Sequence, residues 1–521
     1  MSSRTADKII HDALATDFVS SSGPKVTVQI GDQGPQYKLP KNVLRQQSHY
    51  FKAILNDPLQ ESNTQTTILQ EFEGNVSVAS FGLLVQWMFV GMVIFPSLDT
   101  PEEEVSLAIE FARLADMCGV AGTEPTAVWQ IKRAILRHPA STPQTFHSFG
   151  ALRDKDSNTY CLTPEHLELA AELPENHPVR KILADASIEG YIRRSGPSKA
   201  KFWNEMLTIP SYGVDVLRQT HEALRTVRII FLEGNKVLFQ DPITGIDSPP
   251  ESKDPQIYNR MSSNPKKQTG QKEAGELPSS IAIRDFATSN PPESKDPRIT
   301  FIIGKSGRKY TVSKRILVAN SKYFSRMSDE GQLEEGREGT KLDDIDGVLS
   351  QPSFEMLLRY IYTGKTKVPA GLAADQKISL LLELVRLGEM CAVTGLVQMD
   401  KFAAYKIRQI ILENPGPKDN RHHFDRSPDT NTFCISSQHI ASAMVLPKGH
   451  PVRRVLVSAT VEGYIRGRTP KFAREITEID GFAADLLAQV KRTLLNGRTI
   501  LGSEGVFQFT DPLSDTLVYH S

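Results

Sequence analysis

The 521-residue sequence is poor in cysteine and tryptophan, has no excess of charge of either sign and has no long apolar run. Its four cysteines, at positions 118, 161, 391 and 434, form no Cys-x-x-Cys pair. So few cysteines, with no such pair, predict free thiols in a reducing compartment. We therefore expect an intracellular protein, either cytoplasmic or nuclear. No stretch of about 18 apolar residues occurs, so we expect no membrane-spanning helix and no membrane partner.

The charge balance argues against a nucleic-acid partner. Lys plus Arg and Asp plus Glu each number 61, so the chain as a whole has no electrostatic attraction to a phosphate backbone. Short basic stretches at 199–201 and 264–267 contain no interleaved aromatic residues. Such stretches are typical of solvated surfaces.

The sequence contains one long internal repeat. Residues 26–51 align with 299–324 without a gap, at an offset of 273, and ten of the 26 positions are identical. The same offset aligns 177–193 with 450–466, where both copies read His-Pro-Val-Arg and end in Glu-Gly-Tyr-Ile-Arg. A period of this length is too long for a solenoid repeat and predicts two whole modules with one fold.

The segment between the copies differs in composition. Residues 243–297 are rich in Pro, Ser, Lys and Glu and poor in aromatics, so they cannot bury enough apolar surface to offset the entropy of ordering. We expect a disordered linker there. At the other end, Ile9, Ile10, Ala13 and Leu14 would share one face of a short N-terminal helix.

Local patterns predict a mixed α and β module. Residues 25–31 and 37–40 have β-branched character around a Gly-containing turn and predict a hairpin, which 300–304 and 309–312 repeat. Apolar residues at helical spacing follow at 43–55 and 316–324, and again at 354–363 and 380–390. Later segments are mainly helical, with a final strand near Phe239 or Phe509. Phe51 and Phe324 are expected to be core residues.

Few residues suggest chemistry. His177 and His450 could act as a base or a ligand, but each precedes Pro at a helix entry, where packing or capping is the simpler interpretation. Arg180, Arg453, Glu189 and Glu462 are expected to have structural roles, in buried ion pairs or on solvated faces. Cys118 and Cys391 are expected to be small core residues.

Two short motifs, Gly304-Lys-Ser and Gly364-Lys-Thr, lack the earlier glycine of a phosphate-binding loop. We therefore expect a hairpin turn and a helix end there. From these patterns we predict no catalytic, cofactor-binding or metal residues.

The residues at 299–304 with 310–324, and Phe354 to Gly364 followed by Leu387-Gly-Glu-Met-Cys, resemble a BTB/POZ domain. The first copy resembles it at 43–51 and at Phe81 to Gly91, where Phe89-Val-Gly replaces Tyr-Thr-Gly. The His-Pro-Val-Arg helix is similar to the tail of many fungal BTB proteins. The resemblance implies an α+β fold, protein partners, frequent dimerisation and no catalysis; some members are substrate adaptors of cullin-type ubiquitin ligases.

We therefore expect an α+β protein with two copies of a BTB/POZ-like fold, each followed by a mainly helical extension. The predicted segments are an N-terminal segment 1–22, BTB-like domain 23–138, helical extension 139–242, linker 243–297, BTB-like domain 298–413 and helical extension 414–521. The expected function is non-enzymatic protein–protein interaction, as a scaffold or as a cullin-ligase adaptor. An enzyme or a nucleic-acid binder that uses the helical extensions is the alternative of another class.

Pairing of the two domains is the remaining expectation. A flexible chain of about 55 residues spans about 40 Å root-mean-square, enough to bring neighbouring modules together. The sequence leaves open an intramolecular pair, a homodimer and two independent modules.

Overall fold

A computed structural model of the chain describes part of each module. The described residues are 24–31, 35–55, 66–69, 76–138, 157–193, 200–226, 229–232, 236–240, 242–243, 247–248, 297–303, 308–333, 339–342, 348–417, 430–467, 470–495, 500–501 and 507–520. The predicted N-terminal helix and most of the predicted linker lie outside them. None of the described helices combines the length and apolar character needed to cross a membrane.

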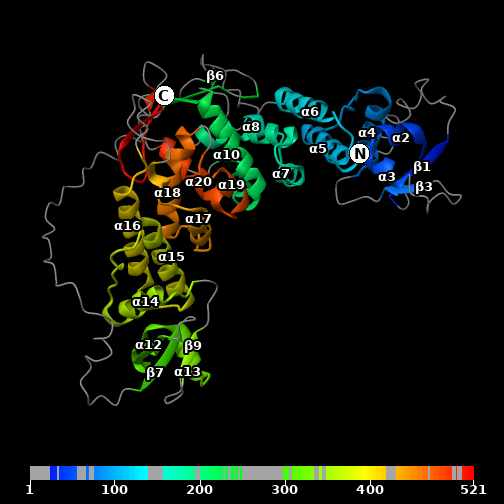
Figure 1. Cartoon of the computed structure of the whole chain (residues 1–521). Coiled ribbons are helices and arrows are strands. Elements are labelled where there is room, and N and C mark those ends of the chain that lie inside the picture. The colour runs from blue at the N-terminus through cyan, green and yellow to red at the C-terminus, as the bar shows by residue number, and fades with distance from the viewer. Residues whose placement is uncertain are drawn as a thin grey trace. The chain divides into compact units, whose positions relative to one another are not determined.

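The chain divides into two compact units, Met1–Glu251 with Val490–Phe507 and Ser252–Gln489 with Gln508–Ser521. Each unit contains a small sheet and a larger set of helices (Figure 1). The α+β class expected from the sequence is confirmed.

The first unit begins with a sheet in the order β2-β1-β3. As predicted, β1 and β2 form an antiparallel hairpin, with Val28 opposite Tyr37. The sequence did not predict β3, which runs parallel to β1 with Thr27 opposite Thr66. The elements are β1 (Lys25–Ile30), β2 (Gln36–Pro40), α2 (Lys41–Gln47), α3 (His49–Ile54), β3 (Thr66–Leu69), α4 (Val78–Val90), α5 (Pro101–Met117) and α6 (Glu124–Arg137).

The second unit begins with the same element types in the same order. Its sheet has the order β8-β7-β9, again with an antiparallel hairpin and a parallel third strand in which Phe301 lies opposite Thr340. The elements are β7 (Arg298–Ile303), β8 (Arg308–Ser313), α12 (Lys314–Asn320), α13 (Lys322–Asp329), β9 (Thr340–Leu342), α14 (Gln351–Thr363), α15 (Ala374–Met390) and α16 (Leu396–Glu413).

The helical pattern predicted over 43–55 is two helices, not one. Ser48 is extended, with φ −133° and ψ 126°, and its side chain accepts a hydrogen bond from the backbone N–H of Phe51 as the N-cap of α3. The Ser48 hydroxyl also donates to the carbonyl oxygen of Cys118 at 2.6 Å. Ser321 makes the same bond to Cys391, also at 2.6 Å. The break therefore fixes the helix pair to the end of the long helix in both units.

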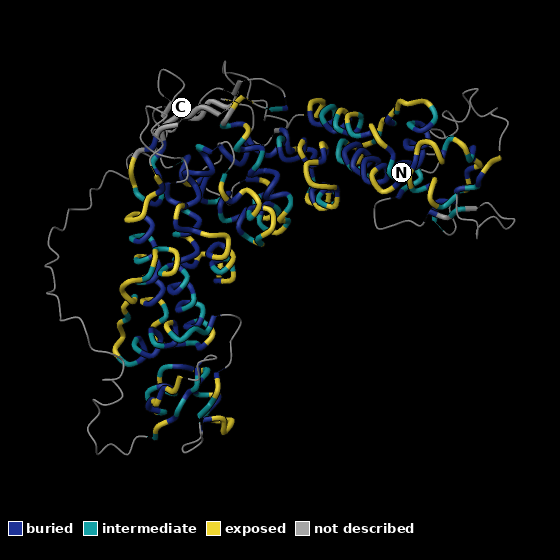
Figure 2. The backbone as a smooth tube through the Cα atoms, viewed as in Figure 1, coloured by how far each residue is buried: buried dark blue, intermediate teal, exposed yellow. Residues whose placement is uncertain are grey.

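Helices pack over these sheets around Phe51 and Phe324, which are 0% and 1% exposed and confirm the prediction that they are core residues. In the second unit the Phe324 ring lies 5.4 Å from that of Phe301, which lies 5.8 Å from that of Phe354. The first unit has Val28 at the place of Phe301. In both units buried positions gather where helices face one another, and exposed positions lie on their outer sides (Figure 2).

The extensions are mainly helical, as expected, and end in short strands. The first contains η3 (Ser157–Thr159), α7 (Pro164–Ala171), α8 (Pro178–Arg193), α9 (Trp203–Thr208), α10 (Pro210–Arg225), β4 (Ile229–Leu232), β5 (Lys236–Gln240) and β6 (Asp247–Ser248). The second contains η6 (Thr430–Thr432), α17 (Ser437–Met444), α18 (Pro451–Arg466), α19 (Ala473–Glu478), α20 (Phe482–Leu495), β10 (Ile500–Leu501), β11 (Phe507–Thr510) and β12 (Leu517–His520). The strands predicted near Phe239 and Phe509 are β5 and β11. Strand β6 lies inside the predicted linker and pairs with β5.

Candidate interaction surface

The two histidines singled out in the sequence cap helices. Nδ1 of His177 accepts a hydrogen bond from the backbone N–H of Val179, and Nδ1 of His450 accepts one from Val452, both at 3.2 Å. A nitrogen that accepts from N–H carries no proton, so the hydrogen of each neutral ring lies on Nε2. The capping role that the sequence favours is therefore the one found.

Three side chains of the kinds that bind metals, Glu389, Asp400 and His450, lie close together. One ligand atom from each of Glu389, Asp400 and His450 lies within 4.8 Å of the others, and His450 Nε2 is 3.3 Å from Asp400 Oδ2. The cap, however, places the ring proton on Nε2, the nitrogen that a metal would need. We interpret the cluster as a buried imidazole facing a carboxylate. The first module has Ala127 in place of Asp400.

The repeated arginines form buried ion pairs. Arg180 Nε donates to Asp215 at 2.7 Å, and its other nitrogens donate to the carbonyls of Leu173 and Ser211. Arg453 pairs with Asp485 in the same way. Every nitrogen of Arg180 therefore has a structural partner. The pKa of Asp215 is raised because burial outweighs the attraction of Arg180.

The repeated glutamates do not pair with these arginines. Glu189 and Glu462 are both fully buried, and Glu462 accepts a hydrogen bond from Arg466 at 2.8 Å. The arginines and Glu462 therefore have structural roles, as expected. The i,i+4 spacing of Glu462 and Arg466 is visible in the sequence, whereas the partners of Arg180 and Arg453 lie too far along the chain to be found from spacing.

A second histidine pair, which the sequence did not reveal, links the extensions to α5 and α15. Nδ1 of His166 accepts from the backbone N–H of Thr163 at 3.1 Å, and Nε2 lies 2.8 Å from the hydroxyl of Ser106 on α5. In the second unit His439 makes the same contacts to Ser436 and Ser379. Burial lowers the pKa of His166 to about 4. The signal that could have found it is a Thr-x-x-His capping box.

Cys118 and Cys391 are buried core residues, as expected, and Gly364 ends a helix. Cys118 and Cys391 are buried at the ends of α5 and α15, and burial raises the pKa of each thiol to about 12, so neither is a thiolate at neutral pH. Gly364 is the left-handed C-cap of α14, with φ 67°, which is the predicted helix end. The Gly304-Lys-Ser motif lies outside the described residues.

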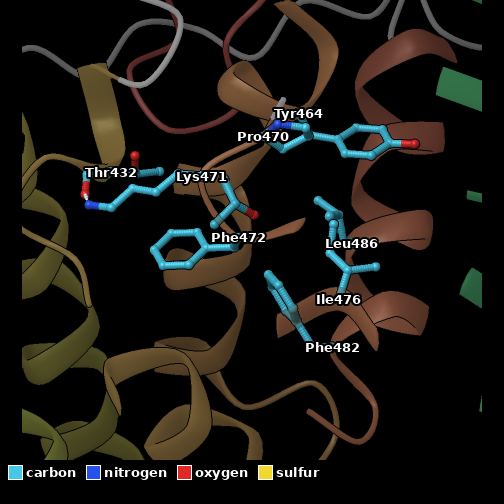
Figure 3. Close-up of a pocket in the computed structure, with 9 residues that line it drawn as sticks. Thr432, Tyr464, Pro470, Lys471, Phe472, Ile476, Phe482 and Leu486 are labelled. Carbon is cyan, nitrogen blue, oxygen red and sulfur yellow. Dashed lines mark hydrogen bonds between the residues drawn. The ribbon is translucent and has the colours of Figure 1, made fainter. Parts of the chain in front are cut away.

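A small cavity in the second extension is too small for a substrate. It measures about 10 Å³, room for about one water molecule. Figure 3 shows Phe472, Phe482 and Leu486 around it, with Lys471 extended toward Thr432. The Lys471 ammonium donates to the carbonyls of Thr432 and Ile435 at 2.7 and 2.8 Å.

This lysine holds an exposed aromatic residue in place. The two Lys471 hydrogen bonds fix the turn on which Phe433 is exposed. In the first extension Lys201 fixes the turn on which Tyr160 is exposed, by donating to three backbone carbonyls. An exposed aromatic on a fixed turn is a typical anchor for a protein partner.

A larger cleft in the first unit is polar and open. It measures about 450 Å³ and is lined by Asn176, His177, Lys181, Asp215, Arg218, Gln219, His221 and Glu222. Arg218 bridges it by donating to Asn176 and Glu175 at 2.6 and 2.5 Å. Every residue in this lining is polar or charged, whereas ligand pockets are mostly lined by apolar residues with a few polar groups. The cleft therefore differs in composition from a typical small-molecule pocket.

The outer surfaces of the two modules differ more than their cores. At the end of α4 and just beyond it the first module exposes Val90, Met92 and Ile94, and Ile94 is 72% exposed. The aligned residues of the second module are Thr363, Lys365 and Lys367. Exposed apolar residues close together are typical of protein-binding surfaces. This surface, rather than a pocket, is the candidate functional feature of the first module.

A comparison with protein families finds the BTB/POZ domain at residues 294–399. This range contains β7 to the start of α16, so the second copy carries a BTB/POZ domain, as the sequence resemblance implied. The match does not extend to residues 23–138. No curated protein shows significant similarity to the chain.

Proposed function

We propose that this chain is a non-enzymatic interaction protein that acts as a scaffold through two BTB-like domains, 23–138 and 298–413. The observation that carries the proposal is the BTB/POZ domain at 294–399, whose order of strands and helices recurs in the first module. The domain supports protein partners and dimerisation. The second BTB-like domain is our extension of that finding.

The contacts of the polar residues support a role other than catalysis. The capping histidines, the buried arginines and the histidines that link the extensions all bond to protein groups in fixed positions. A catalytic site needs polar groups that converge on a space for substrate. The enclosed cavity is water-sized, and in the larger polar cleft the Asp215 and Arg218 side chains already bond to protein groups. An enzyme or nucleic-acid binder in the extensions is the less supported alternative.

Pairing of the BTB-like domains is the form of interaction that we propose, within one chain or between two. A tether of this length supplies an effective concentration of up to about millimolar. The intramolecular pair therefore competes with the homodimer.

Light scattering over a range of concentrations, together with small-angle scattering, tests this proposal on the full chain. It predicts either twice the chain mass of 57.9 kDa or a single-chain mass with a compact profile. A single-chain mass with two separated modules at every concentration would contradict pairing.

A narrower form of the proposal is a substrate adaptor of a cullin-type ubiquitin ligase. The BTB/POZ match favours it because some members of the family have this role. In this form one module would bind the cullin and the other surfaces would bind a substrate. Co-purification of the full chain with a cullin N-terminal domain tests it, with binding expected and absence of binding restricting the chain to the scaffold role.

A further inference from the structure

Helix α6 of the first module presents an apolar and basic stripe to solvent. Trp129 is 58% exposed and Leu136 is 44% exposed. Residues seven apart lie two turns apart on one face of a helix, about 10 Å along its axis. The two side chains therefore form a row on the outer face of α6, whose inner face is buried at Ala127, Ile131 and Ala134.

Positive charge borders this row. The guanidinium of Arg133 lies 5.2 Å from the centre of the Trp129 ring, and Lys132 and Arg137 flank Leu136 in sequence. None of these three cations forms an ion pair with the described residues, and Arg133 Nε is a buried donor with no protein acceptor. Tryptophan and arginine are the residue types that most often dominate binding energy at protein interfaces.

We infer that this stripe, Trp129, Lys132, Arg133, Leu136 and Arg137, binds an acidic amphipathic helix of a partner protein. Two apolar anchors two turns apart match the i and i+7 positions of a helix that lies along α6. Carboxylates beside those anchors would face the three cations and pair with their exposed nitrogens. The inference rests on the proposed scaffold function and names the chemistry of one partner.

Charge argues against two other occupants. A second copy of the chain presenting the same stripe would place three cations against three cations. Residues 139–156, which follow α6, contain Arg153, Asp154, Lys155 and Asp156 and so carry no net charge when histidine is neutral. A phosphate backbone would satisfy the cations but would gain little from Leu136.

The second module supplies a matched control. Tyr405 on α16 is 64% exposed, and the Lys406 ammonium lies 5.7 Å from the centre of its ring. At the position that aligns with Leu136, however, the second module has Gln409. Tyr405→Ala thus removes an exposed aromatic with a neighbouring cation but leaves the α6 stripe intact.

The test selects peptides of about 16 residues, long enough for about four helical turns, from a random display library on the full-length protein. Selected peptides are then measured by fluorescence anisotropy. We expect an excess of Asp and Glu with apolar residues at helical spacing. Trp129→Ala should weaken their binding at least about tenfold, Lys132→Glu with Arg133→Glu should do the same, and Tyr405→Ala should leave affinity unchanged.

The inference is overturned if the selected peptides are neutral or basic, if Trp129→Ala with Leu136→Ala leaves affinity within about twofold, or if the stripe variants lose only double-stranded DNA binding. Thermal unfolding checks that each exposed substitution leaves the fold intact. If the stripe binds no acidic peptide but light scattering shows pairing, only the acidic partner is rejected. If both acidic-peptide binding and pairing are absent, the scaffold function is rejected too.

Discussion

The two modules share several buried polar contacts but present different surfaces. Ser48 and Ser321, like His166 and His439, make the same hydrogen bonds at positions 273 apart. By contrast, exposed Met92 and its counterpart Lys365 have opposite polarity. Buried polar groups must keep their partners because an unsatisfied one is costly. The surface is free of that constraint, so the partners of the two modules should differ.

The largest expected effect tests whether the cores are equivalent. Phe51→Ala and Phe324→Ala should each destabilise their own module by about 3–5 kcal/mol, because each removes a fully buried ring. Calorimetry of the full chain measures the shift, with Lys322→Ala as the exposed control. An effect of Phe324→Ala no larger than that of the control would remove this residue from the core.

The next effect tests whether the linking histidines behave alike. His166 is neutral in the fold because burial lowers its pKa to about 4, and burial lowers the pKa of His439 as well. In the unfolded chain this histidine is protonated below about pH 6.5, whereas in the fold it stays neutral down to about pH 4. The free energy of unfolding therefore decreases as pH falls through this window, by about 3 kcal/mol for His166.

His166→Gln with His439→Gln isolates this effect. Glutamine can keep the capping box without titrating. Urea unfolding at a series of pH values should show a shallower acid loss for the variant than for the wild type. Identical acid profiles would contradict buried, neutral histidines.

A smaller effect distinguishes the modules at the capping histidine. Asp400→Ala removes the carboxylate that lies 3.3 Å from His450 Nε2 and should cost at most about 1 kcal/mol, because no hydrogen bond joins the two groups. Asp400→Asn keeps an oxygen at this position and should cost less. Zn²⁺ should not stabilise the wild type. Stabilisation by zinc that Asp400→Ala abolishes would contradict our placement of the ring proton.

The smallest effect concerns the divergent surface. Met92→Lys with Ile94→Lys gives the first module the lysines of the second, and stability should change by less than about 0.5 kcal/mol because both side chains are exposed. Partner binding by the first module should fall. Melting curves measure the stability of the variant, and affinity measurements on the same preparation measure its partner binding. A large loss of stability would show that Met92 and Ile94 are packed rather than exposed.

Local patterns in the sequence predicted the hairpins, the main helices and the buried Phe51 and Phe324. They missed β3 and β9 because a parallel partner is distant in the chain and leaves only a short, weak pattern. They also missed the pairing of His450 with Asp400, which depends on packing between α16 and α18. The helix break at Ser48 needed the Cys118 carbonyl, 70 residues away. Local periodicity contains none of these contacts.

The central claim is that the first module carries the same domain as residues 294–399. An experimental structure of the full chain tests it most directly. The account predicts a β2-β1-β3 sheet with β3 parallel to β1, followed by helices that superpose on α14, α15 and α16 at the offset of 273. A first module without that parallel strand, or with its helices in another order, would contradict it.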